Sequence, residues 1–316
     1  MTEPARGWIL AAPSSNSGKT LVSAALIRLL ARQGATVTPY KIGPDYIDPG
    51  FLSAAAGAIC RNLDPWAMDP ARLGRLLQDQ PGSRFLIEGV MGLFDGAASG
   101  DGSTADIAAA FGLPVILVIN TSGQGASVAA LAQGFANHRS DITVAGVIFT
   151  RVGSARHERI LRDACDDAGV RVFGALASDP ALTLQARHLG LVQAGERADL
   201  DPLLDRAADR LAENLDLDGL QDIAAPAAIT KSGPAKPLRP LGQHIAIARD
   251  IAFGFCYQHI LDDWRDAGAH LSFFSPLADE SPEADADAIY LPGGYPQLHA
   301  GALSANENFL RGLRDA

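Results

Sequence analysis

The 316-residue sequence carries a formal net charge of −10, with 47% hydrophobic and 20% charged residues. This composition is typical of a folded globular protein, and the length predicts about two domains. The acidic balance, without any basic run, argues against a nucleic-acid partner. Three scattered cysteines without C-x-x-C spacing indicate a reducing compartment, and the apolar runs are too short for a signal peptide or membrane span. We therefore expect a cytoplasmic protein without a membrane partner.

Apolar runs alternate with helical patterns along the first part of the chain. Strands are predicted at 7–12, 35–43, 84–92, 113–123, 142–152 and 170–176, and amphipathic helices at 19–34, 127–138 and 156–169. This alternation predicts an α/β fold with a doubly wound, mostly parallel sheet of the P-loop NTPase type, whose ligands bind at the carboxyl ends of the strands. A proline-rich stretch at 222–243 is interpreted as a linker. A second α/β pattern follows, so the predicted domains are 1–221 and 244–316.

The stretch AAPSSNSGKT follows the first predicted strand and opens the first predicted helix. It matches the end of the phosphate-loop pattern G-x-x-x-x-G-K-[ST], whereas Pro13 replaces the leading glycine. Such a loop offers backbone N–H groups and a helix dipole to phosphate oxygens, and the alternative is an ordinary helix start with a surface lysine. The position after a strand favours the phosphate loop. The nucleotide-binding residues are then Ser15, Ser17, Gly18, Lys19 and Thr20.

Carboxylates gather after two other predicted strands. Glu88 comes directly after an apolar strand, and Asp95 follows in a glycine-rich turn. An ionised carboxylate in such a place is costly without a cation, and Mg²⁺ prefers oxygen ligands. The stretch YKIGPDYIDPGF reads as a loop, and its lysine and two aspartates could hold a metal, a phosphate or a substrate carboxylate. The alternative is that these acids only cap helices.

Other polar residues have a simpler interpretation. The stretch GSTADIAAAFG is typical of a helix that opens at Ser103 or Thr104. His157 and His188 are interpreted as structural or solvent-facing. Cys256 and His259 lie close in sequence, but the stretch offers neither an orienting acid nor a nucleophile turn, so we do not expect a catalytic pair.

Taken together, these stretches resemble the cobyrinic acid a,c-diamide synthase family, the ATP- and glutamine-dependent amidases of cobalamin synthesis. The matching stretches, in order, are SGKT, YKIGPDYIDPGF, NLDPWAM, IEGVMGLFDG, GSTADIA, PVILVI, RHLGLV and YLPGGYPQLHA. GPDYIDP and EGVMGLFDG are specific, and NLDPWAM leans towards the branch that acts on the cobalt-free ring, hydrogenobyrinic acid. The resemblance implies an N-terminal domain similar to dethiobiotin synthetase and a C-terminal, flavodoxin-like domain similar to class I glutamine amidotransferases.

The resemblance also implies an activity and a set of site residues. ATP would activate the a and c side-chain carboxylates of cobyrinic or hydrogenobyrinic acid as acyl phosphates, and ammonia derived from glutamine would displace the phosphate. Mg²⁺ would be held by Thr20, Glu88 and Asp48. The residues around the reacting phosphate and the substrate carboxylate would be Lys41, Asp45, Tyr46, Asp48 and Asp95. The family further implies a homodimer.

Three departures from the family pattern qualify these expectations. Thr150 replaces an asparagine that contacts adenine in the relatives, and Asn120 stands where an aspartate is common. The chain also ends at Ala316, before the family's glutaminase cysteine and histidine. We therefore expect that this chain uses free ammonia but does not hydrolyse glutamine, and that its second domain is partial, with apolar faces left uncovered.

Three alternatives to this activity remain open. The first is a dethiobiotin-synthetase-like ligase that acts on another carboxylate. The second is a partition-type switch ATPase, which the missing early lysine of the loop disfavours. The third is a non-catalytic protein that holds a corrinoid without processing it.

Overall fold

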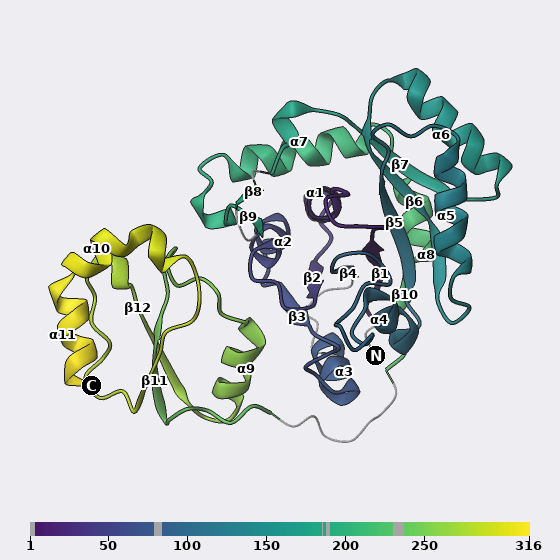
Figure 1. Cartoon of the computed structure of the whole chain (residues 1–316). Helices are drawn as coiled ribbons and strands as arrows, with labels where there is room; N and C mark the ends of the chain where they lie inside the picture. The colour runs from purple at the N-terminus through teal and green to yellow at the C-terminus, as the bar shows by residue number, and fades with distance from the viewer. Residues whose placement is uncertain (1–3, 79–83, 185, 188–189, 230–236) are drawn as a thin grey trace. The chain divides into compact units, whose positions relative to one another are not determined.

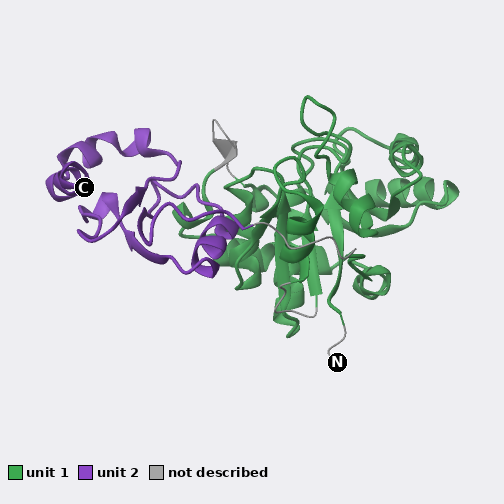
Figure 2. Ribbon diagram, turned by 90° about the horizontal axis from the view of Figure 1, so that it is seen from below, with its two compact units in different colours: residues 1–235 green, residues 236–316 purple. Residues whose placement is uncertain are grey.

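The computed structural model describes residues 4–78, 84–184, 186–187, 190–229 and 237–316. The chain forms two compact units, residues 1–235 and 236–316, which Figure 2 shows in different colours. Each unit has its own parallel sheet and its own hydrophobic clusters. The α/β fold predicted from the sequence is confirmed in both units.

The first unit contains the larger sheet. Its strands are β1 (Arg6–Ala11), β2 (Val37–Ile42), β3 (Arg61–Leu63), β4 (Arg84–Glu88), β5 (Pro114–Asn120), β6 (Thr143–Val152), β7 (Val172–Ala177) and β10 (Ala225–Pro226), with a separate pair β8 (Ala186–Arg187) and β9 (Gly190–Leu191). Its α-helices are α1 (Lys19–Arg32), α2 (Asp48–Ala56), α3 (Pro70–Gln78), α4 (Thr104–Phe111), α5 (Ser127–Asn137), α6 (Ala155–Asp167), α7 (Leu200–Ala212) and α8 (Leu217–Ile223). Short 3-10 turns are η1 (Pro180–Leu182) and η2 (Ala194–Glu196).

The strand order of this sheet brings the ends of β1, β2 and β4 together. The order is β3-β2-β4-β1-β5-β6-β7, all parallel, and β10 pairs antiparallel with the start of β1 (Figure 1). Residues of β1 alternate between two clusters: Trp8 and Leu10 pack with α1, α2, α7 and α8, whereas Ile9 packs with α3, α4, α5 and α6. A sheet covered on both faces explains why its central strands are apolar throughout. Strands β2, β3 and β4 lie on one side of β1, and β5, β6 and β7 lie on the other, so the strand order switches sides beside β1. Folds of this kind bind ligands at the carboxyl ends of the strands next to such a switch point.

Two local features differ from the expectations. The stretch after β2 was expected to be a loop, but helix α2 begins at Asp48, with Pro49 in its first turn. Proline fits that position because the first helical N–H needs no intrahelical partner, and Phe51 and Leu52 bury the helix against the sheet. The strand expected at 84–92 ends at Glu88, where a glycine-rich loop begins.

The predicted linker at 222–243 begins with residues that belong to the first unit. Its first residues complete α8 and form β10, and the Ala228 N–H donates to the carbonyl of Phe111 at 2.8 Å. Residues 230–236 of the predicted linker lie outside the described part of the chain. The roles predicted for residues 1–221, as a synthetase domain, and for residues 244–316, as part of an amidotransferase domain, stay predictions.

The second unit is a smaller three-layer arrangement. Its elements are β11 (His244–Ala248), α9 (Gln258–Asp266), β12 (His270–Phe274), η3 (Pro276–Ala278), β13 (Ala288–Tyr290), η4 (Pro296–His299), α10 (Ala300–Ala305) and α11 (Glu307–Asp315). The parallel sheet has the order β12-β11-β13. Trp264 of α9 packs on one face, and Phe309 of α11 packs on the other. Both faces of this sheet therefore carry a helix, although Phe273 and Leu298 remain partly in solvent.

Candidate functional site

The loop between β1 and α1 has the backbone shape of a phosphate loop. Asn16 and Gly18 adopt positive φ angles of 61° and 85°, and Gly18 is the N-cap of α1 without a side-chain cap. The first N–H groups of a helix have no intrahelical acceptor, so this end of the 14-residue α1 can receive an anion. The loop is held from inside, because Ser17 Oγ donates to the Ser14 carbonyl at 2.8 Å.

Thr150 supports this loop from beneath. Its hydroxyl, at the end of β6, donates to the Ser17 carbonyl at 2.7 Å, and the side chain is 3% exposed. A Cβ added at Gly18 would lie 3.4 Å from Thr150 Cγ2. From the sequence, Thr150 was expected only to change the contact with the adenine base. In the structure its hydroxyl also fixes the shape of the phosphate loop.

Lys41 is the centre of a buried charge cluster at the carboxyl ends of β2 and β4. Its ammonium lies 3.3 Å from Glu88 Oε1, 3.1 Å from Asp48 Oδ2 and 3.7 Å from Asp45 Oδ2. It also donates to the Gly89 carbonyl at 2.9 Å. The sequence-predicted Lys41, Asp45, Asp48 and Glu88 are therefore brought together, although Glu88 is 47 positions away from the lysine.

The electrostatics of this cluster keep the lysine charged. Burial would lower the pKa of Lys41, but the carboxylates of Glu88, Asp48 and Asp45 outweigh this effect and raise it above its ordinary value. Burial also raises the pKa of Asp45, and the neighbouring charge of Asp48 adds to the rise. The Asp45 carboxylate still has a structural task, because its Oδ1 accepts N–H bonds from Ile47 at 2.8 Å and Asp48 at 3.0 Å. These bonds fix the turn that leads into α2.

Lys19 reaches from the phosphate loop to the loop after β4. Its ammonium donates to the carbonyl of Met91, a residue with a positive φ of 42°. Burial lowers the pKa of Lys19, and the charge of Lys41 lowers it further. Asp95 stabilises the same loop, since its Oδ2 accepts the Gly92 N–H at 2.9 Å. Two lysines and the acids at or after the ends of β2 and β4 thus meet at one edge of the sheet.

Glu88 provides the test of whether a metal ion fits here. The side chain is fully buried, its Oε1 accepts from the Thr20 hydroxyl at 2.9 Å, and its Oε2 is buried without a hydrogen-bond partner. A buried carboxylate oxygen without a partner is costly, and hard oxygen ligands are those that Mg²⁺ prefers. The donor set of Glu88 and Thr20 therefore fits this ion. The predicted contribution of Asp48 as a ligand stays a prediction.

The remaining sequence-predicted residues occupy different places. Ser15 and Tyr46 lie at the surface of the phosphate loop and of the β2–α2 loop. His157 joins two loops at the same sheet edge, because Nδ1 accepts the Gly153 N–H and Nε2 lies 2.7 Å from the Gln124 carbonyl. His188 lies outside the described residues. Burial raises the pKa of Cys256 to about 11, which opposes a nucleophilic role for that thiol.

Sequence reasoning missed two residues that shape the site. The Asn62 amide donates to the carbonyls of Gly43 at 3.0 Å and Asp45 at 2.7 Å, and so ties the β2–α2 loop to β3. The Thr104 hydroxyl accepts the N–H of Val90 at 3.1 Å. Asn62 belongs to the stretch NLDPWAM, which served only as a family signature, so its position in a motif was the available signal.

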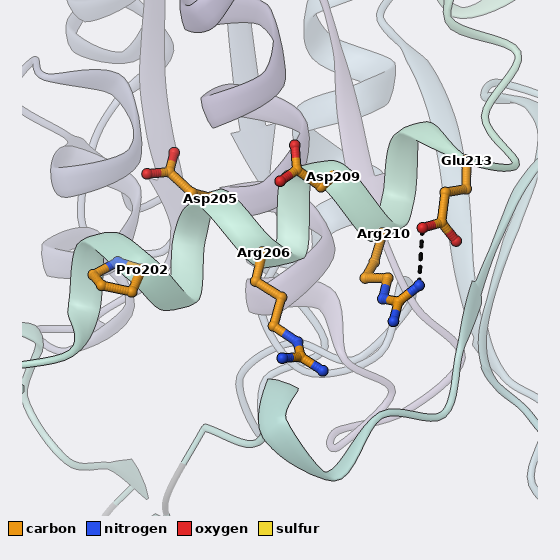
Figure 3. A pocket seen from close by; sticks show the side chains of 6 residues that line it. All are labelled: Pro202, Asp205, Arg206, Asp209, Arg210 and Glu213. Carbon is orange, nitrogen blue, oxygen red and sulfur yellow. Dashed lines mark hydrogen bonds and ion pairs between the residues drawn. The ribbon is translucent and has the colours of Figure 1, made fainter.

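A surface hollow on α7 is separate from this charge cluster. Figure 3 shows its lining side chains along one helix: Pro202, Asp205, Arg206, Asp209, Arg210 and Glu213. Asp205 pairs with Arg28 at 2.8 Å, and Arg28 lies nine positions after Lys19 on α1. At 1.5 Å per residue these positions are about 14 Å apart along the helix axis. The hollow carries ion pairs that join α7 to α1 and does not extend the phosphate loop.

Comparison with known proteins identifies the family. The profile of the CbiA family, described as the CobQ/CobB/MinD/ParA nucleotide binding domain, matches residues 8–192. The hydrogenobyrinate a,c-diamide synthase of Rhizobium meliloti is 53% identical over 312 residues, which cover 98% of this chain and 72% of the relative. The enzyme of the same name from Brucella anthropi is 51% identical over 315 residues, with the same two shares. The chain belongs to the hydrogenobyrinate a,c-diamide synthase family.

Membership in the hydrogenobyrinate a,c-diamide synthase family confirms the predicted resemblance and the prediction of an amide-forming ligase of cobalamin biosynthesis. It also supports a nucleotide-binding role for the matched residues. Among solved structures, the septum site-determining protein MinD complexed with Mg-ADP from Pyrococcus horikoshii OT3 aligns with a TM-score of 0.39 and 18% identity. That alignment covers 56% of this chain and 83% of MinD. In the described part of the chain, no helix combines the length and the apolar character needed to cross a bilayer.

Proposed function

We propose that this chain amidates the a and c side-chain carboxylates of hydrogenobyrinic acid, or of its cobalt-containing counterpart, at the expense of ATP. The buried cluster of Lys41 with Glu88, Asp45 and Asp48 beside the phosphate loop is the observation that carries the proposal. A carboxylate resists ammonia until one oxygen becomes a leaving group. Transfer of the γ-phosphoryl group to that oxygen gives ADP and an acyl phosphate, and ammonia then displaces inorganic phosphate to leave the amide.

The residues of the chain have distinct tasks in this scheme. The N-terminal end of α1 and the backbone of the phosphate loop bind phosphate oxygens. Lys19, now bonded to the Met91 carbonyl, would turn to the β- and γ-phosphates, where its charge offsets the charge that develops during transfer. Lys41 is held in the charged state by its acids, so it can orient the substrate carboxylate or the transferred phosphoryl group. Because its acids fix Lys41 before substrate binds, this lysine needs little reorganisation during the reaction.

We propose ATP and Mg²⁺ as the nucleotide and the ion of this site. Glu88 and Thr20 would hold Mg²⁺, which, when bound, neutralises charge on the phosphates. The buried, unpartnered Oε2 atom of Glu88 supports this assignment. Asp95 and Tyr46, both near the protein surface, are proposed to face the substrate side.

The test is an amidation assay that follows the mass of the ring. Purified chain is incubated with Mg-ATP and hydrogenobyrinic or cobyrinic acid, together with either ammonium or glutamine. Two successive exchanges of OH for NH₂ with ammonium establish the synthetase activity. Turnover with glutamine would show that the chain also generates ammonia. No change of mass with either nitrogen source, in protein with a cooperative unfolding transition, would refute the activity and leave a corrinoid-binding protein.

Assembly and domain roles are part of the proposal. Residues 1–221 are proposed as the ATP-dependent synthetase domain and residues 244–316 as a region related to glutamine amidotransferases. We further propose a homodimer, which light scattering on the purified chain tests directly, since a monomeric mass would refute it.

A further inference from the structure

Trp66 is an unusually exposed aromatic residue of the first unit. The side chain lies in the loop between β3 and α3, and the residue is 69% exposed. A tryptophan left in water forgoes one of the largest apolar burials that a side chain can make. Trp8 and Trp264, the other two tryptophans of the sequence, are 0% and 5% exposed. Trp66 is therefore the one that a ligand could cover.

The loop that carries Trp66 is held in a fixed position. Asp64 Oδ1 accepts the Trp66 N–H at 3.1 Å, and Met68 anchors the loop in the core with 8% exposure. A Cβ added at Gly102 would lie only 3.1 Å from the Trp66 Cβ, so the backbone of the glycine-rich loop passes directly beside the tryptophan. Gly102 also has a positive φ of 86°, which favours glycine. The indole is thus displayed in solvent by a backbone that has little freedom.

Both loops that hold Trp66 lead to the buried charge cluster. On one side, β3 pairs with β2 so that Asn62 lies opposite Lys41, and the Asn62 amide bonds to the Asp45 carbonyl at 2.7 Å. On the other side, Gly102 precedes α4, whose Thr104 hydroxyl bonds to the Val90 N–H beside the Lys41 acceptor Gly89. Figure 1 shows β3, β2 and β4 as neighbours. Trp66 therefore follows the carboxyl end of β3, at the same edge of the sheet as the cluster around Lys41.

Two other large apolar side chains are exposed at the same edge. Tyr46 is 38% exposed in the β2–α2 loop, and Met91 is 43% exposed in the loop after β4. Each comes from a loop that also supplies a contact to Lys41 or Lys19. Exposed apolar groups at the same sheet edge as a cluster of polar residues mark a ligand site more often than scattered ones do.

We propose that Trp66 is a binding platform that stacks against the apolar face of the conjugated ring while a side-chain carboxylate of the ring reaches the lysines. This inference rests on the proposed function, since it names how the same site holds its substrate. A flat conjugated ring with carboxylates at its periphery needs one apolar contact surface and one charged pocket. Trp66 supplies the first, and the cluster around Lys41 supplies the second.

Binding of hydrogenobyrinic acid to variants, measured by calorimetry, tests the proposal. Trp66→Ala should weaken this binding about tenfold, or about 1.4 kcal/mol, because it removes the stacked contact together with part of the buried apolar area. Trp66→Phe should retain most of the affinity, and the affinity for ATP should stay unchanged in both. Ile59→Ala is the matched control. Ile59 is also a large apolar residue with 51% exposure, but it precedes β3, whereas Trp66 follows this strand.

Fluorescence gives a second readout that does not need turnover. Acrylamide should quench the wild-type emission through Trp66, and hydrogenobyrinic acid should reduce this quenching. In Trp66→Phe, whose remaining tryptophans are buried, acrylamide quenching should be weak with or without the ring.

The outcomes separate the platform from the activity. A wild type that binds and amidates the ring, with equal affinity in Trp66→Ala, would overturn the platform and leave the proposed function intact. A variant that changes only the oligomeric state would overturn it as well, because Trp66 would then contact another chain. A wild type that does not bind the ring would refute the proposed function and this inference together.

Discussion

Glu88→Gln removes one fully buried charge and keeps the shape of the side chain. The amide oxygen can still accept from Thr20 and Lys41, which lie 2.9 Å and 3.3 Å from Oε1, and Lys41 keeps Asp48 at 3.1 Å. A lost charged hydrogen bond costs stability, but the loss of an unpartnered carboxylate oxygen offsets part of that cost. We expect the free energy of unfolding of the unliganded protein to fall by only about 1–2 kcal/mol.

The effect of the same substitution on ligand binding should be larger. At a concentration one hundred times its Kd, a ligand stabilises the native state by about 2.7 kcal/mol. If loss of the metal-binding carboxylate weakens Mg-ATP about 100-fold, the same concentration then equals the Kd, and the stabilisation falls to about 0.4 kcal/mol. Urea unfolding with and without Mg-ATP measures this difference, and Thr20→Ser, which retains a hydroxyl, is the control that should keep most of the stabilisation. A Glu88→Gln protein with the full wild-type stabilisation by Mg-ATP would refute the assignment of Glu88 to the metal.

Three further predictions concern the loop, its neighbour and a thiol. Thr150→Val removes the hydroxyl that supports the Ser17 carbonyl, so the Kd for ATP measured by calorimetry should rise several-fold; an unchanged Kd would mean that the loop keeps its shape without this bond. Gly89→Ala places a Cβ 2.7 Å from Thr104 Oγ1 and 3.2 Å from a backbone oxygen, so urea unfolding should show a loss of about 1–3 kcal/mol, and wild-type stability would contradict the packing. Because burial raises the pKa of Cys256 to about 11, the thiol stays protonated as pH rises through neutrality. Its alkylation, located by mass spectrometry, should accelerate about tenfold per pH unit up to that pKa, whereas a plateau at the ordinary thiol pKa of about 8.5 would be inconsistent with this burial.

The apolar strands were predictable because burial on both faces leaves a simple pattern. The residues FLI before Glu88 and the residues PVILVI of β5 include no polar side chain, so the strand pattern is unambiguous. Helix α2 was not predicted, because Pro49 and Gly50 are typical of turns, and only burial of the following residues against the sheet stabilises a helix there. The short strand β10 was hidden in a proline-rich stretch, because two residues carry too little periodicity to be read.

The members of the site were predictable as residue types, but their contacts were not. Glu88 and Lys41 each stood out near the end of a strand, yet only the order of the strands places them side by side. The hydrogen bond from Lys41 to the Gly89 carbonyl, the bond from Lys19 to the Met91 carbonyl and the bond from Thr150 to the phosphate loop all end on backbone atoms that every residue has. Such contacts leave no signature in a single sequence.

The pairing of β10 with β1 has a consequence for the synthesis of this chain. Arg6 lies opposite Pro226, and the Arg6 guanidinium donates to the Ala224 carbonyl at 3.0 Å, although 218 positions separate them. β1 leaves the ribosome first, but its pairing is complete only after β10, the last strand of this sheet, has been synthesised. Contacts of such long sequence separation form slowly, because a long loop must close first. A nascent chain that stalls before Pro226 would have every strand from β1 to β7 and still present one open side at the beginning of β1, where a chaperone or a second nascent chain could pair.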